Sequence, residues 1–232
     1  MMTRPTHAPV LSTTAGDLPL AECKLGVGGR EWSVLHAAAI LDRATEEQFV
    51  TDPDNLIPYG AALWPAAIAL AHEIATRGSE FRTRSVLELG AGTGLPGIVA
   101  ASLGASVVQT DQNELALHLC RVNGTRNRIA GIEYRVADWT AWDDPGRYDW
   151  IVGSDVLYAD TLHENLKRIF EGNLAPGGRV LIADPFRTAS RPLLERLEAA
   201  GWRAAHSRWS IGDPADARPV AVYELTPPQR AG

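Results

Sequence analysis

The chain has 232 residues, of which 45% are hydrophobic and 22% are charged, as in an ordinary globular protein with a sizeable core. Its formal net charge of -6 disfavours a nucleic-acid partner, because such proteins present a basic face to the phosphate backbone. We therefore expect no nucleic-acid partner.

The two cysteines, Cys23 and Cys120, lie far apart and indicate reduced thiols rather than a disulfide or a metal site. The histidines show no metal-ligand spacing, so no metal is expected. The longest apolar run, 61–71, is too short to span a bilayer, and residues 1–20 lack the apolar segment of a signal peptide. We expect a cytoplasmic protein without a membrane partner. The chain is rich in arginine and has only two lysines, which is typical of a GC-rich, bacterial source.

The N-terminal part is predicted to be a tail, a hairpin and a loop. Residues 1–17 are rich in Pro, Thr and Ala without periodicity, so we expect a flexible tail. Two strand-like runs flank Gly28-Gly29, a dipeptide that accepts positive φ angles, and they predict a β-hairpin. The segment "TDPDNLIPYG" predicts a loop, so residues 18–58 form an N-terminal hairpin and loop.

A helix is expected to begin near Trp64, with Pro65 in its first turn, where a missing N–H leaves no helical hydrogen bond unmade. It should end at Arg77-Gly78, since a cation and a glycine are common at the last helical turn.

Short apolar runs alternate with amphipathic stretches from residue 86 onwards, which predicts a parallel sheet with helices on both faces. The runs "VLEL", "WIVG" and "VLIA" are nearly all apolar, as central strands buried on both faces should be. Residues 201–232 instead contain two strand-like runs joined by a Gly/Pro/Asp loop, which predict a closing antiparallel hairpin. We predict a single domain over 18–232, with a cofactor-binding core at 59–200.

The stretch "VLELGAGTGLPG", residues 86–97, admits two interpretations. Its second half, 92–97, has the G-x-G-x-x-G spacing of a dinucleotide-binding loop. The glycines at 90, 92 and 94 equally form G-x-G-x-G after Glu88, the loop expected around S-adenosylmethionine. In both cases the ligand lies beyond the carboxyl ends of the first and fourth strands, where the winding of the sheet reverses.

Asp111 ends the second strand and is placed to accept the ribose hydroxyls of either cofactor, so it does not discriminate. A short-chain dehydrogenase would need a Tyr-x-x-x-Lys pair, and neither Lys24 nor Lys167 has a tyrosine four residues earlier. Glu88 is well placed to accept from the amino group of a methionine moiety, which a nicotinamide cofactor lacks. We therefore predict S-adenosylmethionine as the cofactor and S-adenosylhomocysteine as its product.

Four motifs stand along this core: "LWPAAIALA" around Trp64, "LELGAGTGLPGI", "ADW" ending at Trp139, and "DVLY" from Asp155 to Tyr158. With them, residues from about 58 to 200 resemble the seven-β-strand S-adenosylmethionine-dependent methyltransferases, specifically the family 16 group that contains many protein-lysine methyltransferases. The resemblance implies an α/β fold with a Rossmann-like, doubly wound, mostly parallel seven-stranded sheet. We expect an antiparallel closing hairpin and an N-terminal β-hairpin extension on this sheet.

The resemblance also implies a cofactor pocket built from these motifs and from the strand ends. The residues expected to bind the cofactor are Trp64, Glu88, Gly90, Ala91, Gly92, Thr93, Gly94, Asp111, Gln112, Asp138, Trp139 and Ser154. Trp64 and Trp139 also fit simple core packing, and Asp138 either hydrogen-bonds the adenine amino group or caps the next segment. Ser154 stands where the family often has alanine.

Asp155 and Tyr158 are the expected catalytic residues. Asp155 ends the fourth strand, where a carboxylate needs a ligand or a donor, and a loop cap is the alternative role. The resemblance favours a lysine side chain of a protein as the methyl acceptor, held by Asp155 and faced by Tyr158 in an aromatic wall. A small-molecule amine, or a cofactor-binding module without catalysis, are the alternatives. Asp184 and Arg187 either contact the substrate or belong to an exposed turn.

Overall fold

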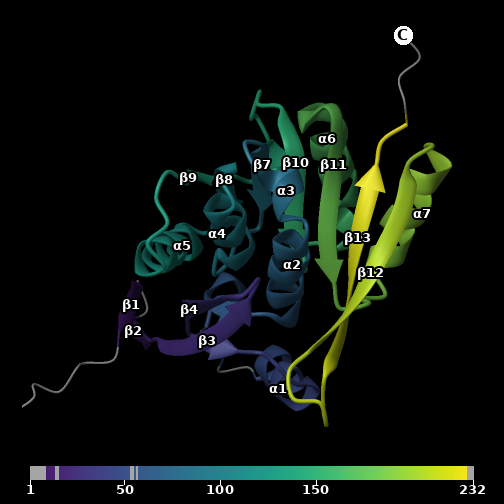
Figure 1. Cartoon of the computed structure of the whole chain (residues 1–232). Coiled ribbons are helices and arrows are strands. Elements are labelled where there is room, and N and C mark those ends of the chain that lie inside the picture. The colour runs from purple at the N-terminus through teal and green to yellow at the C-terminus, as the bar shows by residue number, and fades with distance from the viewer. Residues whose placement is uncertain (1–8, 14–15, 53–54, 56, 229–232) are drawn as a thin grey trace, which may run out of the picture.

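The computed structural model describes residues 9–13, 16–52, 55 and 57–228 (Figure 1). Its centre is a seven-stranded sheet with the strand order β12-β13-β11-β10-β7-β8-β9. The strands are β7 (Ser85–Leu89), β8 (Ser106–Asp111), β9 (Glu133–Val136), β10 (Tyr148–Ser154), β11 (Leu174–Asp184), β12 (Arg203–Ile211) and β13 (Arg218–Thr226). All neighbours from β9 to β11 are parallel, while β13 is antiparallel to β11 and β12. The predicted doubly wound α/β fold with an antiparallel closing hairpin is confirmed.

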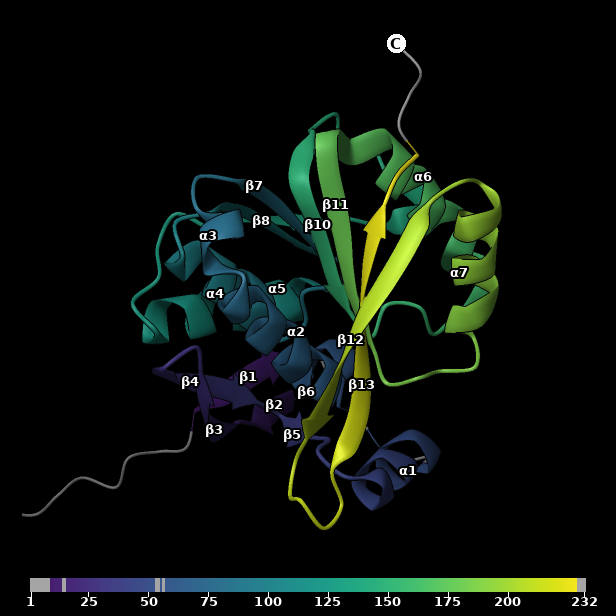
Figure 2. The same cartoon turned by 45° about the vertical axis from the view of Figure 1, so that its right-hand side comes forward.

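Helices cover both faces of the sheet (Figures 1 and 2). One face carries α2 (Pro65–Thr76), α4 (Leu95–Ser102) and α5 (Glu114–Arg126), and the other carries α6 (His163–Asn173) and α7 (Ser190–Ala199). Helix α2 begins at Pro65 as predicted, but Gly78 starts the short helix α3 (Gly78–Phe81) instead of ending α2. Within the described ranges, no helix is long and apolar enough to cross a membrane.

Strand β7 shows why the core runs are continuously apolar. Val86 packs in the cluster beneath α2 and α4, whereas Leu87 and Leu89 pack in the cluster beneath α6 and α7. All three side chains are fully buried, and each such burial contributes about 1.5–3 kcal/mol to folding. Glu88 is the one ionisable side chain of this strand, although the strand is buried on both faces.

The segment predicted as a tail is partly ordered, which corrects that expectation. Strand β1 (Val10–Thr13) pairs antiparallel with β2 (Gly16–Pro19), while residues 1–8 and 14–15 lie outside the described residues. The physical reason is a small core, in which Leu11 is buried together with Leu20 and with Leu119 of α5. The few apolar residues of this segment are thus sufficient to dock it.

The predicted N-terminal hairpin is confirmed as β3 (Ala21–Val27) and β4 (Arg30–His36), which turn at Gly28-Gly29. Asn123 of α5 holds the hairpin, because its side chain accepts from the Leu35 N–H at 2.8 Å and donates to the Leu35 carbonyl at 3.0 Å. The same amide donates to the Thr93 carbonyl at 2.9 Å. The hairpin is therefore fixed to the glycine loop through one buried side chain.

Residues 37–63 contain a helix where only a loop is predicted. After the two-residue strand β5 (Ala38–Ala39), helix α1 (Arg43–Thr51) begins at Asp42, whose carboxylate accepts from the Thr45 N–H at 2.7 Å. Strand β6 (Ala62–Leu63) then pairs with β5. An N-cap aspartate followed by Glu and Gln is a helix-start signal in the sequence, but Phe49 is the only buried residue of α1.

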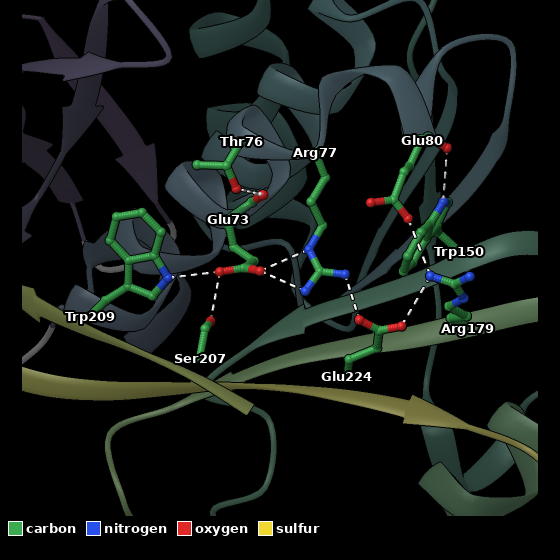
Figure 3. Close-up of polar contacts among 9 residues, drawn as sticks. All are labelled: Glu73, Thr76, Arg77, Glu80, Trp150, Arg179, Ser207, Trp209 and Glu224. Carbon is green, nitrogen blue, oxygen red and sulfur yellow. Dashed lines mark hydrogen bonds and ion pairs between the residues drawn. The ribbon is translucent and has the colours of Figure 1, made fainter. Parts of the chain in front are cut away.

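A polar network crosses the α2 face of the sheet at β12 and β13 (Figure 3). The Glu73 carboxylate accepts from Ser207 at 2.6 Å, from the Trp209 indole at 2.9 Å and from Arg77 at 2.7 Å. Arg77 also donates to Glu224 at 2.5 Å. Burial acts to raise the pKa of Glu73, but these hydrogen bonds outweigh it and hold the pKa below its usual value. The network fastens the antiparallel strands to α2.

We expect Glu73→Ala to lower the free energy of unfolding by about 3 kcal/mol, because it leaves Ser207 and the Trp209 indole without their acceptor and removes one of the two carboxylates that bind Arg77. Glu80→Ala is the matched control: Glu80 pairs with Arg179 across 3.2 Å, but both side chains are 42% exposed. Such an exposed pair contributes at most about 1 kcal/mol. Urea unfolding measures both variants, and equal losses would contradict this account of the network.

Candidate functional site

A cavity of about 730 Å³ opens at the carboxyl ends of the central strands. Its lining residues follow β7, β8 and β10 and include parts of α1 and of the segment before α2. β7 and β10 are neighbours in the sheet although they are far apart in sequence, so the cavity lies where the winding reverses. This is the position expected from the strand pattern of the sequence.

The floor of the cavity is the backbone turn after β7. Gly90 and Gly92 have φ angles of 61° and 54°, the left-handed region that favours glycine. A Cβ atom on Gly90 would stand 3.3 Å from the Trp139 ring and 3.2 Å from Val156. The loop can therefore bring its backbone close to a ligand at Gly90, where a side chain would crowd Trp139 and Val156.

Asp111 fixes this loop from the end of β8. Its carboxylate accepts from the Gly92 N–H at 3.1 Å and from the Asn113 N–H at 2.9 Å. The side chain is buried, and burial raises its pKa, partly offset by these hydrogen bonds. Each carboxylate oxygen keeps lone pairs toward the cavity, so Asp111 fits the predicted role of accepting ribose hydroxyls.

Glu88 lies behind the loop and does not line the cavity. Its carboxylate accepts from Gln109 at 2.6 Å and from the Gly97 N–H of α4 at 3.1 Å, while its second oxygen has no partner among the described residues. Burial raises the pKa of Glu88 to about 8, so the group is mostly protonated at neutral pH. Its binding of a cofactor amino group stays a prediction, and its burial argues against that role.

The remaining residues predicted for the cofactor line the cavity with one exception. Ala91, Thr93, Gln112, Ser154 and the loop glycines at 90 and 92 are in the lining, whereas Gly94 is not. Gly94 instead precedes α4 and packs beside Cys120. The sequence pattern thus located the cavity lining well, but it included two residues that lie beneath the loop.

Trp64 and Trp139 are partly buried: both line the cavity, and both also pack against a hydrophobic core cluster of the protein. Trp64 stacks on Tyr59 with ring centroids 6.0 Å apart and an angle of 2°, and Phe49 of α1 meets both rings edge-on. Trp139 also lines the cavity, and its ring lies against Gly90 of the loop. The sequence predicts a loop at Tyr59. Its aromatic side chain is the only local sign that this residue lines a cavity.

Asp138 has the capping role that was one of its two predicted alternatives. Its carboxylate accepts from the N–H of Thr140 at 2.8 Å and from the hydroxyl at 2.7 Å, and it begins the short 3-10 helix Trp139–Ala141. It also lines the cavity, so the cap turns Trp139 toward the glycine loop. A contact of Asp138 with adenine stays a prediction.

Asp155 and Tyr158 both line the cavity, with the exposed part of Tyr158 at its mouth. Asp155 has a φ of 54°, which is uncommon for a residue other than glycine. Both of its carboxylate oxygens accept from Arg187, one from Nε and the other from Nη2 at 2.5 Å. Tyr158 is half exposed, and burial of the rest of its side chain raises its pKa.

Arg187 is the functional residue that the sequence left undecided. It is neither an exposed turn residue nor free, because its fork holds Asp155 and its Nη2 lies 3.4 Å from Glu46 of α1. The predicted need of Asp155 for a donor is met within the chain. In the described ranges no cluster of His, Cys, Asp or Glu could hold a metal ion, and both cysteines are free thiols.

The sheet order, the glycine turn after β7 and the acid at the end of β8 define a class I S-adenosylmethionine-dependent methyltransferase. The residues fit this cofactor, because the glycines of the turn expose backbone to the cavity, Asp111 gives acceptors and Trp139 gives a flat wall. A family model described as lysine methyltransferase matches residues 47–194, and the chain belongs to that family.

Similar proteins agree with this class. The protein N-lysine methyltransferase METTL21A of Xenopus tropicalis is 36% identical over 115 residues, which are 47% of this chain and 53% of that protein. The histone-arginine methyltransferase METTL23 of Xenopus laevis is 37% identical over 116 residues, 47% of this chain and 50% of that protein. The chain thus spans about half the length of the curated relatives it matches.

Solved structures share the fold at low sequence identity. The ribosomal protein L11 methylase of Lactobacillus delbrueckii subsp. bulgaricus gives a TM-score of 0.53 at 20% identity, over 68% of this chain and 80% of that chain. The N-methyltransferase NodS of Bradyrhizobium japonicum WM9, in complex with S-adenosyl-L-homocysteine, gives 0.53 at 17%, over 68% and 88%.

We expect Glu88→Gln to bind S-adenosylhomocysteine within about threefold of wild type, because residue 88 lies behind the loop. The pKa of Glu88 is raised in the folded protein, so its stabilisation is present below pH 4.5 and lost as pH rises through about 8. Wild type should therefore lose about 1.4 kcal/mol per pH unit in this window relative to the variant. Calorimetry and pH-dependent unfolding measure both effects.

The exposed Glu114→Gln is the control for this variant, and its unfolding should follow wild type at every pH. A loss of cofactor affinity of more than tenfold in Glu88→Gln, with unfolding unchanged, would instead place Glu88 in contact with the cofactor.

Proposed function

We propose that this protein transfers a methyl group from S-adenosylmethionine to the amine of a lysine side chain in another protein. The observation that carries the proposal is the position of Asp155 and Tyr158 at the mouth of the cavity that the glycine turn floors. Membership of the lysine methyltransferase family supports the same reaction. The relatives named for lysine methylation are matched over only part of their length, so the substrate class belongs to the proposal.

The cofactor would be held by Asp111 at its ribose, by the backbone of 90–93 along its length, and by Trp139 and Trp64 as walls. When bound, S-adenosylmethionine supplies an activated methyl group on a positively charged sulfur. The chain itself must then align a nucleophile with that methyl group. Alignment alone can lower the barrier by roughly 7–11 kcal/mol. A single general base speeds a reaction about 10²- to 10⁴-fold, which corresponds to a smaller lowering of about 3–5 kcal/mol.

The amine must lose its proton before it attacks, because an ammonium group has no lone pair. A wall of Tyr59, Trp64 and Tyr158 would desolvate the amine and so lower its pKa. Asp155 would accept an N–H of the amine and orient it. Tyr59, Tyr158 and Val50 are each more than half exposed at this mouth, which suits the chain of a protein substrate better than a fully enclosed small molecule.

The proposed site of action is the cytoplasm of a bacterium. Its support is the pair of free thiols at Cys23 and Cys120 and the arginine-rich, lysine-poor composition. Fractionation of cells that express the tagged chain tests this placement, and recovery outside the cytoplasmic fraction would contradict it.

A labelled methyl donor tests the reaction and the acceptor class together. Purified protein is given donor labelled in the methyl group with a protein extract, and separately with the small-molecule fraction of that extract. We expect label in protein, on the lysine side-chain nitrogen after hydrolysis. Label only in the solutes would instead support a small-molecule amine, label on arginine would change the acceptor, and no label would support a cofactor-binding module.

We expect Asp155→Ala to lower the methylation rate at least 100-fold while S-adenosylhomocysteine binds within about threefold of wild type, because Asp155 would orient the acceptor and not the cofactor. Asp160→Ala, at an exposed acid outside the cavity lining, is the control and should keep both properties. The methylation rate is measured with labelled donor, and the affinity for S-adenosylhomocysteine is measured by calorimetric titration. An equal loss of rate and cofactor affinity would place Asp155 in the cofactor site instead.

A further inference from the structure

A cluster of five charged side chains surrounds the proposed acceptor site. Arg187 forms a two-pronged ion pair with Asp155, and its backbone N–H donates to Asp184 at 2.8 Å. Glu46 of α1 lies between Arg187 and Arg218, and it accepts from Arg218. The cluster therefore joins α1, the end of β10, the end of β11 and the start of β13.

The three carboxyl groups of this cluster face two guanidinium groups, so one carboxyl group is in excess. Burial raises the pKa of Asp184 to about 6, so this excess negative charge is present above that pH and is lost below it. The Asp155 carboxylate raises the pKa of Arg187, so this guanidinium stays charged at every relevant pH. Glu46, Asp184 and Tyr158 are the titratable groups that face Asp155 or Arg187 directly. Behind them, Arg218 pairs with Glu46, Tyr223 faces Asp184 and Asp111 faces Tyr158.

A carboxylate at the acceptor site has a chemical disadvantage. An opposite charge within about 4–6 Å favours the charged form of an amine and raises its pKa by 1–3 units. An unpaired Asp155 would therefore hold a substrate lysine as an ammonium ion, which cannot attack a methyl group. An Asp155 that is already neutralised by a fixed cation can still accept an N–H but stabilises the ammonium much less.

We infer that Arg187 is a positioning residue that neutralises Asp155, so that Asp155 orients the acceptor amine without raising its pKa. The inference rests on the proposed function and adds how the site would keep the acceptor amine neutral. Both carboxylate oxygens of Asp155 accept hydrogen bonds from Arg187, and the Asp155 side chain is only 9% exposed. The geometry of the pair is therefore fixed. Glu46 of α1 lies 3.4 Å from Nη2 of Arg187, the same nitrogen that donates to Asp155, and so links α1 to the pair.

The test is the pH dependence of methylation by Arg187→Ala. The probe is the protein that wild type labels in the extract, purified and used at saturating concentration. We expect the midpoint of the rising limb of the rate to move up by at least one pH unit, so that the rate falls about tenfold at pH 7.5 and returns to within threefold of wild type at pH 9.5. Arg187→Lys keeps the charge and should keep the midpoint near that of wild type.

Glu46→Gln is the matched control, because it removes the tether on α1 but leaves the pair of Arg187 with Asp155. Its midpoint should not move. All variants should bind S-adenosylhomocysteine within about threefold of wild type, which shows that the cofactor cavity is intact. If Arg187→Ala does not fold, Arg187→Gln replaces it as the neutral variant.

The outcomes separate the two proposals. An active wild type with an unchanged midpoint in the neutral variant overturns the role of Arg187, and so does a uniform loss of rate across all pH values. A faster rate at pH 7.5 in the neutral variant also overturns it, because Arg187 would then obstruct the amine. An inactive wild type contradicts the proposed function itself, before any variant is compared.

Discussion

The hydrogen bond between the Gly92 N–H and Asp111 is the constraint on which the site depends. It joins the turn after β7 to the end of the neighbouring strand β8 across 3.1 Å. Because both ends are anchored in a sheet that is buried on both faces, the turn cannot shift without disturbing the core. The backbone of the glycine turn thus sets the position of the cavity floor.

The walls around this floor come from segments that are distant in the sequence. Helix α1 brings Phe49 against Trp64 and Tyr59, and the same helix brings Glu46 toward Arg187. The N-terminal extension therefore serves both the cavity wall and the charged cluster at its mouth. Under the proposed function, the cofactor would lie against strand ends of the sheet and the acceptor would meet the added elements, where substrate specificity can differ within one fold.

In the proposed reaction an amine approaches as a cation but reacts only as a neutral group. A carboxylate that is already paired within the chain would keep a hydrogen-bond acceptor in place without adding an unpaired negative charge beside the amine. Asp155, whose φ of 54° is uncommon for a residue other than glycine, is held in this position by both prongs of Arg187.

Local patterns in the chain were sufficient to predict the sheet, its cover of helices on both faces and the glycine turn at the floor of the cavity. Apolar runs, the glycines at 90 and 92 and the acid at 111 act through local backbone geometry, which is encoded by residues close together in the chain. The residues that line the cavity beyond the glycine loop were largely predicted for the same reason, since they sit at strand ends.

Only the tertiary structure decided which polar groups meet. It placed Glu88 behind the loop, with Gln109 from the next strand, although the spacing in the sequence suggested the cavity. It paired Asp155 with Arg187 and set α1 beside them, contacts between residues that are far apart in the chain. Such pairings depend on how whole elements pack against one another, and no local pattern in the chain records that packing.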